Sequence, residues 1–254
     1  MKKISFVILA FIFIFCNTGI HAITVTNGLI GHWAGDGNAN DLSGNNNHGT
    51  LQNGVTYTSG KFGQAFSFDG VNDYVNIAAT ASTDSVTKEF TIHAWVKPSS
   101  IQSGWNVIMM REGRAPYLNY TSNTLFPKMH LSTQGQTVAA SSTVATPVNV
   151  WSHVVGVYDG SYARIYINGI EIQNVAVSGD LVTNTGGSVQ GKSFWIGAEQ
   201  TYYFFSGAID DVALYNRALN SAEITSLYSN TPIPEPGSYF LFFVGAVILI
   251  ARSE

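Results

Sequence analysis

Apolar and polar residues alternate along several short segments in the middle of the chain. In residues 90–97, apolar residues at the even positions alternate with Thr, His, Trp and Lys, and a period of two predicts a half-buried strand. Asp159-Gly160 and Asn168-Gly169 separate three such segments, and these pairs favour tight turns between antiparallel strands. Further strands are expected at 65–68, 74–77, 128–132, 154–158, 163–168, 170–172, 193–197 and 208–215.

One helix is expected near the end of this region. Asn220 and Glu223 form a capping box ahead of the apolar residues Ile224 and Leu227. No low-complexity linker interrupts residues 23–230, so we expect one domain there. Short strands separated by turn residues are typical of a sandwich or jelly roll. The pattern therefore predicts an all-β fold, a two-sheet antiparallel jelly-roll sandwich with a single trailing helical turn.

The first 22 residues have the pattern of a secretory signal. Lys2 and Lys3 precede an apolar run at 4–15, and a cleavage site is expected after Ala22. The run is shorter than the roughly 20 residues that a membrane-spanning helix needs. We therefore expect residues 1–22 to be a signal peptide with a helical apolar run, and the protein to be exported.

Residues 231–254 form a second targeting segment. Pro234-Glu235-Pro236 lies in a proline-rich linker, an apolar stretch at 239–250 predicts a hydrophobic helix, and Arg252 follows. This order resembles the PEP-CTERM sorting signal of Gram-negative bacteria. The resemblance implies an exosortase-type membrane protease as a partner, a transient contact with the inner membrane, and release to the cell surface or the extracellular space. The alternative is an ordinary C-terminal membrane anchor.

The amino-acid composition argues against nucleic-acid partners, intrinsic disorder and disulfide bonds. Only 11% of the 254 residues are charged, and 12 basic against 16 acidic residues give a net charge of −4. Nucleic acids need clustered Lys and Arg, so they are not expected as partners. The 13% of aromatic residues argues against disorder. Cys16, the single cysteine, lies in the signal segment, so the mature domain has no disulfide.

Several strings occur in a fixed order between residues 28 and 219. They are GLIGHWAGDGNANDLSGNNNHGTL (28–51), GKFGQAFSFDGVNDYVNI (60–77), FTIHAWVKP (90–98), WSHVVGVYDGSYARIYINGIEI (151–172) and GAIDDVALYNRAL (207–219). Together they resemble the laminin-G-like, concanavalin A-like jelly-roll domain. The resemblance implies two antiparallel sheets packed face to face, often one calcium site at the sandwich edge, and ligand binding on loops or a concave face.

The loop at 36–50 is a candidate calcium site. Asp41, Asn47 and the backbone near His48 can offer the oxygen ligands that calcium prefers, and glycines allow the loop to curl. The resemblance adds that such a cation is usually shared with the aspartate of the late Gly-x-Ile-Asp strand, here Asp210. Strand alternation would place Asp210 among apolar neighbours, where a carboxylate needs a partner. The alternative is that Asp and Asn form turns within their own loop.

Four aromatic residues are candidates for ligand binding. Trp95 lies on the polar side of its predicted strand, where it can stack on a sugar ring or cover a small cluster. Trp105, Tyr202 and Tyr203 lie in connecting segments, where aromatic rings either fold under the sandwich or form a binding surface.

The sequence gives little support for catalysis. Glycoside hydrolysis needs two carboxylates at a fixed separation, and the alternating Glu-x-Asp-x-Glu strand of glucanases with this fold does not occur. We therefore expect an exported, non-catalytic, calcium-stabilised module that binds carbohydrate or another extracellular polymer. The alternatives are a polysaccharide-acting glycoside hydrolase or lyase on the same fold, and a purely structural matrix protein.

Overall fold

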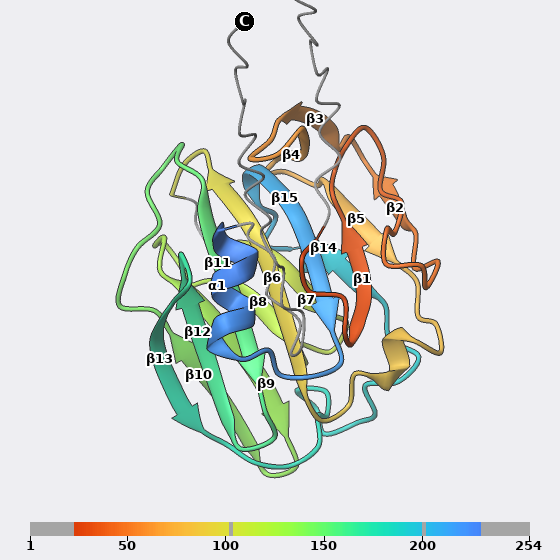
Figure 1. The fold of residues 1–254 in the computed structure, drawn as a ribbon, viewed down its shortest axis with the longest axis vertical. Helices are drawn as coiled ribbons and strands as arrows, with labels where there is room; N and C mark the ends of the chain where they lie inside the picture. Colours follow the sequence, from red (N-terminus) through yellow and green to blue (C-terminus); the bar gives the residue numbers. More distant parts are fainter. Residues whose placement is uncertain (1–22, 102–103, 200–201, 230–254) are drawn as a thin grey trace, which may run out of the picture.

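The computed structural model describes residues 23–101, 104–199 and 202–229. Two antiparallel sheets pack face to face over this part of the chain (Figure 1). The first, which we call sheet A, contains in spatial order β13 (Ile170–Ala176), β12 (Tyr162–Ile167), β11 (Ser152–Tyr158), β6 (Phe90–Pro98), β15 (Ser206–Tyr215), β4 (Gln64–Asp69) and β3 (Thr56–Ser59), with β1 (Leu29–Trp33) paired to β15.

The second sheet, which we call sheet B, has seven strands in the described part of the chain. It contains β10 (Gln136–Ser141), β9 (Pro127–Thr133), β8 (Tyr117–Tyr120), β7 (Val107–Arg111), β14 (Phe194–Ile196), β5 (Tyr74–Ile77) and β2 (Gly49–Gln52). The predicted all-β sandwich is thus confirmed.

Period-two alternation decides which side chains enter the core. In β6, Phe90, Ile92 and Ala94 are fully buried and point between the sheets, where they join apolar residues of both layers. Trp33 and Phe194 are among the largest side chains in this core. The sheets are therefore held together by the alternation that the sequence displays.

The described helices are short. A 3-10 helix, η1 (Thr83–Ser85), precedes β6, and helix α1 (Ser221–Ser229) follows β15. The capping box forms as expected: the Asn220 N–H donates to Glu223 Oε2 at 2.8 Å, and the Glu223 N–H donates to Asn220 Oδ1 at 3.0 Å. Ile224 and Leu227 of α1 pack on the outer face of sheet A.

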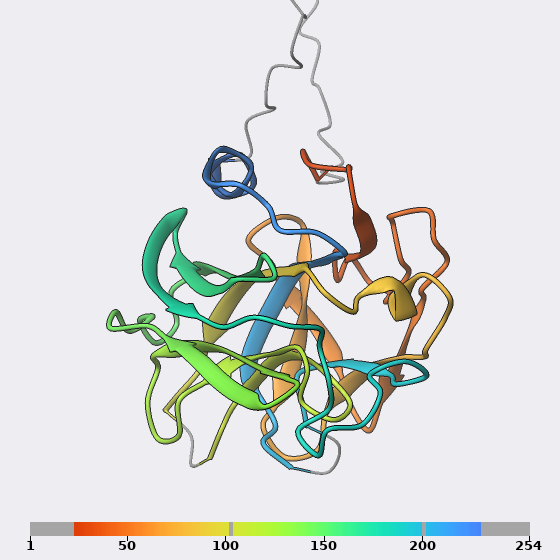
Figure 2. The ribbon, with the colours of Figure 1, turned by 90° about the horizontal axis from the view of Figure 1, so that it is seen from below.

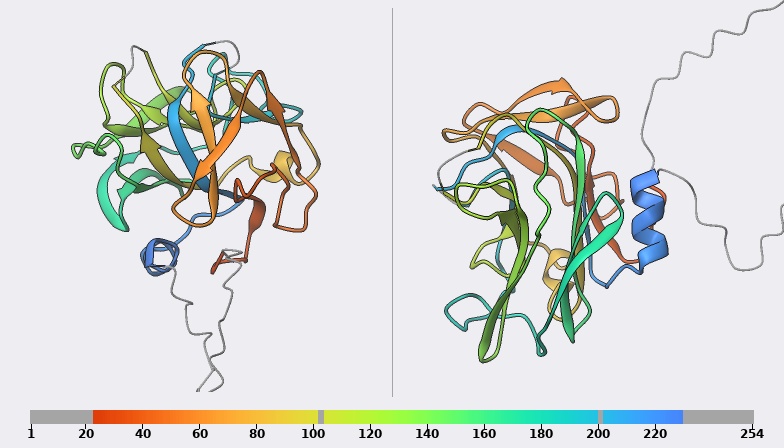
Figure 3. Two further views of the ribbon diagram at one scale, coloured as in Figure 1. Left: turned by 90° about the horizontal axis from the view of Figure 1, so that it is seen from above. Right: turned by 90° about the vertical axis from the view of Figure 1, so that its left-hand side faces the viewer.

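Helix α1 covers the side of sheet A that faces away from sheet B (Figures 2 and 3). Val25, near the start of the described chain, joins the same apolar cluster. Both ends of the domain therefore lie on the outer face of sheet A. None of the helices in the described ranges is long and apolar enough to span a membrane. The signal segment 1–22 and the tail 231–254 lie outside the described residues.

A β-bulge in β15 changes one expectation. Asp211 has a φ of 50°, and the register between β15 and β6 shifts between Asp210 and Ala213. Asp210 therefore lies opposite Trp95 on the outer face of sheet A, while Val212 belongs to the core between the sheets. The expectation that Asp210 shares a face with apolar neighbours of its strand is wrong, because the extra residue breaks the alternation.

Candidate functional site

The outer face of sheet B carries an aromatic cluster that neither described helix covers. Val107, Met110, Tyr117 and Trp195 form its floor, and Trp105 and Tyr203 pack against them from neighbouring loops. We call these six residues the sheet B cluster. They come from strands β7, β8 and β14 and from the segments just before β7 and β15, so the fold assembles the cluster.

Trp105 is the half-buried centre of the sheet B cluster. The Trp105 ring centroid lies 5.5 Å from that of Tyr203 and 6.5 Å from that of Tyr117. The ammonium of Lys128 lies 4.9 Å from the Trp105 ring centroid, and the guanidinium of Arg114 lies 5.5 Å from it. Cations at such distances are attracted by the electron-rich ring face.

Two residues beside Trp105 have an uncommon backbone conformation. Arg114 has a φ of 61° and Tyr203 a φ of 57°, a region that residues other than Gly, Asn and Asp rarely adopt. Such strain costs of order 1–3 kcal/mol per residue and persists where the surrounding structure holds it. Both side chains contact Trp105, so the strain coincides with the centre of the cluster.

A buried ion pair supports the cluster from one side. Glu199 Oε1 accepts a hydrogen bond of 2.6 Å from Arg114 Nε, and Glu199 Oε2 accepts one of 2.9 Å from the Tyr117 hydroxyl. Glu199 is only 7% exposed. Burial, with the nearby Glu199 charge, raises the pKa of Tyr117 far above its usual value, so Tyr117 remains a hydrogen-bond donor.

Strand β9 continues the polar side of this face. Lys128, His130 and Ser132 alternate with core residues, and Tyr117 contacts the His130 ring at 6.0 Å between centroids. Burial, with the charges of Lys128 and Arg114, lowers the pKa of His130 to about 4, so this ring is neutral at pH 7. Burial also lowers the pKa of Lys128.

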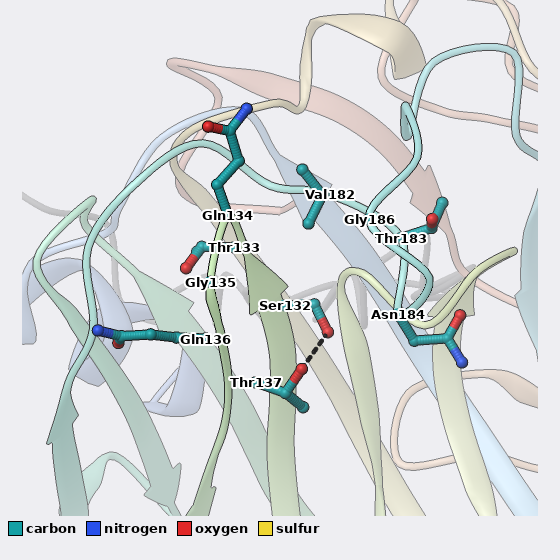
Figure 4. A pocket seen from close by; sticks show the side chains of 10 residues that line it. All are labelled: Ser132, Thr133, Gln134, Gly135, Gln136, Thr137, Val182, Thr183, Asn184 and Gly186. Atoms are coloured by element: carbon teal, nitrogen blue, oxygen red, sulfur yellow. Dashed lines mark hydrogen bonds between the residues drawn. The ribbon is translucent and has the colours of Figure 1, made fainter.

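Two cavities hollow this face and share a residue. One, of about 260 Å³, is lined by Met110, Gly113, Arg114, Asn184 and Glu199. The other, of about 480 Å³, lies between the β9–β10 hairpin and the segment 182–186 (Figure 4).

The larger cavity is lined almost wholly by hydroxyl and amide side chains and by glycine. In it, Ser132 and Thr137 share a hydrogen bond of 3.0 Å (Figure 4). Asn184 lines both cavities, and Met110 of the sheet B cluster lines the smaller one, so the two cavities and the cluster adjoin one another. We call the cluster and the two cavities together the sheet B groove. Hydroxyl and amide groups in the cavities, next to the aromatic rings of the cluster, suit a polar, ring-bearing ligand such as a sugar.

The structure separates the four aromatic candidates of the sequence analysis. Trp105 and Tyr203 belong to the sheet B cluster, and the 64% exposed Tyr202 lies beside Tyr203 at 6.3 Å between ring centroids. Trp95 lies on the opposite side of the molecule, in sheet A, and is 2% exposed. It stacks against Tyr228 of helix α1 at 5.7 Å, so it belongs to a covered cluster instead of an open surface.

The calcium candidates lie in two separate networks. The carboxylate of Asp41 accepts hydrogen bonds from the backbone N–H groups of His32, Ser43 and Asn47 at 2.8–2.9 Å. The Asp41 N–H donates to His48 Nδ1 at 3.1 Å, and the carbonyl of Asn47 accepts from Trp33 Nε1 at 2.9 Å. The oxygens expected to bind calcium in this loop already have protein partners.

Asp210 binds a different turn. Its Oδ2 accepts hydrogen bonds from the N–H groups of Lys61 at 2.7 Å and Phe62 at 3.0 Å, and the Asp36 carboxylate accepts one from Gln64 at 2.7 Å. Burial, with the charges of Asp211 and Asp36, raises the pKa of Asp210 to about 7. Within the described part of the chain, no three His, Cys, Asp or Glu residues are grouped so that they could hold a metal ion.

Several residues of the groove were not found from the sequence, among them Tyr117, Glu199, Arg114 and Lys128. The alternation in β9 places Lys128, His130 and Ser132 on one face, which is a usable signal. Glu199 and Arg114 lie in turns whose meeting depends on the fold. The predicted sorting residues Pro234, Glu235, Pro236 and Arg252 lie outside the described residues.

Comparison with known proteins places the fold. A model of the concanavalin A-like lectin/glucanases superfamily, of laminin G type, matches residues 69–225. Domain 4 of AbnA, a GH43 extracellular arabinanase from Geobacillus stearothermophilus solved with arabinotriose, is 19% identical, with a TM-score of 0.65 over 79% of this chain and 98% of that domain. No curated protein matches the chain in sequence.

Toxin binding domains share the fold as well. The binding domain of Paraclostridial Mosquitocidal Protein 1 is 15% identical with a TM-score of 0.63, and that of Botulinum Neurotoxin DC in complex with SialylT is 15% identical with a TM-score of 0.62. Each match covers 81% of this chain and 52% of the toxin chain, so the chain spans about half the length of these structures. At such identities the likeness concerns the fold alone.

Proposed function

Because this chain belongs to the concanavalin A-like lectin/glucanase superfamily, we propose that it is a non-catalytic carbohydrate-binding module whose ligand lies in the groove of sheet B. The observation that carries the proposal is the aromatic cluster around the half-buried Trp105, which adjoins two cavities that share Asn184. A domain with the same fold, from the arabinanase, has been solved with arabinotriose, which supports a glycan as the ligand class.

The length of the groove supports a chain of sugars. Lys128 and Ser132 lie on the same face of β9, and a strand rises about 3.3 Å per residue, so they are about 13 Å apart along it. Aromatic rings lie at one end of this path and hydroxyl and amide groups at the other. The first and last described residues of the domain lie on the opposite face, away from the groove.

The carboxylate in the groove supports binding over catalysis. Among the residues that line the two cavities of the described structure, Glu199 is the only carboxylate. Both of its oxygens accept hydrogen bonds, from Arg114 and from Tyr117. A glycosidase needs a second carboxylate at about 5–9.5 Å and, in one of the two, a proton to donate. The hydrogen bonds from Arg114 and Tyr117 therefore direct both Glu199 oxygens at protein groups.

A glycan array on the full-length protein tests this function. We expect saturable binding to at least one polysaccharide, and a loss of binding in Trp105→Ala. Trp151→Ala is the matched control, because Trp151 is also half-buried and also has a lysine, Lys97, over its ring at 5.8 Å. Equal losses in both variants, or release of reducing sugar from a bound polysaccharide, would contradict the proposal.

Export and sorting are part of the proposed function. The signal pattern at 1–22 and the Pro234-Glu235-Pro236 segment support a protein that is exported, held briefly at the inner membrane, cut by an exosortase-type protease and released to the cell surface or extracellular space. Mass spectrometry of the mature protein tests this route. We expect a C-terminus near the Pro-Glu-Pro triplet, and an intact Glu254 would mean that the tail is an ordinary anchor.

Calcium stabilisation is proposed with a changed set of ligands. Asp36 and Asp210 each bind the backbone of the turn at 60–64, the charge of Asp36 acts on Asp210, and a cation would offset their repulsion. Asp41 is a poorer ligand, because both of its oxygens already accept hydrogen bonds from the protein. We therefore propose Asp36 and Asp210, with oxygens of the neighbouring turn, as the calcium ligands.

A further inference from the structure

The charged groups around the sheet B groove do not cancel. Arg114 is neutralised by Glu199, with which it forms an ion pair. His130 is neutral at pH 7, and the larger cavity is lined by uncharged residues. Lys128 makes no ion pair with any residue of the described structure. The groove therefore has one uncompensated positive charge, in a protein whose net charge is −4.

The environment of Lys128 makes this charge costly for the free protein. Its ammonium lies over the Trp105 ring, and the half-buried side chain is partly removed from water. Burial lowers the pKa of Lys128, which reflects the cost of holding the charge there. An incoming anion would replace the lost solvation with a charge-assisted hydrogen bond.

The strand next to β9 supplies a further polar group. Asn119 lies directly opposite Lys128 in the β8–β9 pair and is fully buried. Its Nδ2 donates to the carbonyl of Tyr120 at 2.8 Å, and its Oδ1 has no hydrogen-bond partner among the described residues. The neighbour of Lys128 on β8 is therefore an uncharged amide and no carboxylate, so it does not neutralise the ammonium.

We propose that the groove takes an anionic glycan, whose carboxylate or sulfate group pairs with the Lys128 ammonium beside Trp105. This inference rests on the proposed function and names its ligand class. A single lysine recognises one anionic group and does not require the broad basic surface that nucleic acids need. The other sugar units of the ligand lie along β9 toward Ser132 and Thr137, where uncharged donors and acceptors suit hydroxyl groups.

Calorimetric titration of the full-length protein with matched oligosaccharides tests the inference. The probes are oligomers of galacturonate, glucuronate and mannuronate, their neutral methyl esters, and sulfated galactan oligomers. We expect at least one free acid or sulfated oligomer to bind. Esterification and Lys128→Gln should each weaken binding of an acid by about tenfold or more, as loss of one charge-assisted contact predicts.

Control variants separate charge from shape. Lys97→Gln removes the lysine over Trp151 in sheet A and should leave the affinity unchanged. Lys128→Arg keeps the charge and should retain most of the affinity. Binding of sulfated oligomers alone would support the anionic class and assign sulfate as its group.

The failures can be told apart. Binding of neutral glycans that depends on Trp105 but not on Lys128 would overturn the anionic class and leave the proposed function in place. Equal affinity for an acid and its methyl ester would overturn the class in the same way. No binding of any glycan would overturn the proposed function and this inference together.

Discussion

The outer faces of sheet A and sheet B carry similar side chains in different surroundings. On sheet A, Trp95 lies beside His153 at 5.2 Å between ring centroids, under the ammonium of Lys61 at 4.4 Å. On sheet B, Trp105 lies under Lys128. Helix α1 covers the first face through Tyr228, whereas no helix in the described part of the chain covers the second (Figure 3).

The cover decides what each face can do. Beneath helix α1, His93 and His153 are fully buried and share a contact of 3.3 Å, and elsewhere on sheet A His32 pairs with Asp211 at 2.5 Å. Nδ1 of His153 has no hydrogen-bond partner among the described residues, but Tyr228 of the helix packs over this ring at 6.0 Å between centroids, so a ligand cannot reach it. On sheet B the corresponding groups border a groove, where a ligand can reach them. Similar residues thus support the fold on one side and a binding surface on the other.

The largest expected effect concerns the two tryptophans themselves. Trp95→Ala should lower the free energy of unfolding by about 3–5 kcal/mol, because a fully buried aromatic leaves a cavity. Trp105→Ala, at a half-buried surface site, should cost about 1 kcal/mol or less. Urea denaturation of both variants measures the difference. Similar losses would mean that Trp105 is as structural as Trp95 and would weaken the contrast between the faces.

Calcium binding at Asp210, on sheet A, should stabilise the folded protein. At a hundredfold excess over its dissociation constant, a ligand that binds only the folded state stabilises it by about 2.7 kcal/mol. We therefore expect calcium to raise the melting temperature by several degrees over the value in chelator. The increase should vanish in Asp210→Asn and persist in Asp41→Asn, whose carboxylate has protein partners. Equal melting with calcium and with chelator would contradict the site.

A buried histidine on sheet A, His153, and a half-buried one on sheet B, His130, both have lowered pKa values. Burial, with the neighbouring His93, holds the pKa of His153 well below 6.5, so the folded state keeps the ring neutral. Below pH 6.5 the unfolded chain takes up a proton that the folded state does not, so stability falls as the pH falls. The expected loss for His153 is about 1.4 kcal/mol at pH 5.5 relative to pH 7.5.

Matched variants measure how much each histidine contributes to this pH dependence of stability. His153→Gln should flatten the dependence of the melting temperature on pH between 7.5 and 5.5. His130→Gln should flatten it by nearly the same amount over this range, because a pKa of about 4 also keeps the His130 ring neutral in the folded protein down to pH 5.5. A clearly smaller effect of His130→Gln above pH 5.5 would contradict the lowered pKa of this half-buried ring.

The sequence predicts the sandwich well because alternation and turn residues act locally. The capping box of α1 is equally local, since Asn220 and Glu223 bond each other. Local sequence patterns do not predict which outer face of the sandwich a helix packs against. Trp95 and Trp105 both lie near lysines in polar surroundings, and only the return of Tyr228 from the end of the domain distinguishes them. That contact depends on the tertiary fold.

The calcium candidates show a second limit. The Asp and Asn residues of the 36–50 loop suggest metal ligands by type, yet Asp41 uses its oxygens to hold the loop's own N–H groups. The bulge at Asp211 moves Asp210 to the outer face, and its mark in the sequence is only a pair of successive aspartates between the core residues Ile209 and Val212. Residue type identified the acidic groups, and the backbone decided their partners.

The smallest expected effect on stability tests whether backbone strain serves the open face. Tyr203→Asn replaces a residue at a φ of 57° with one that tolerates this conformation, which should gain about 1 kcal/mol. The variant also loses the ring contact with Trp105, which is worth about 0.5–1.5 kcal/mol, so the net change in unfolding free energy should be within about 0.5 kcal/mol of zero. Glycan affinity should nevertheless fall, because Trp105 loses its neighbour.

Tyr202→Ala is the control, because it removes the more exposed adjacent ring without relieving the strain at Tyr203. If Tyr203→Asn stabilises the protein and retains full affinity, the strained tyrosine has no part in binding, and the sheet B cluster would differ from its sheet A counterpart only in being uncovered.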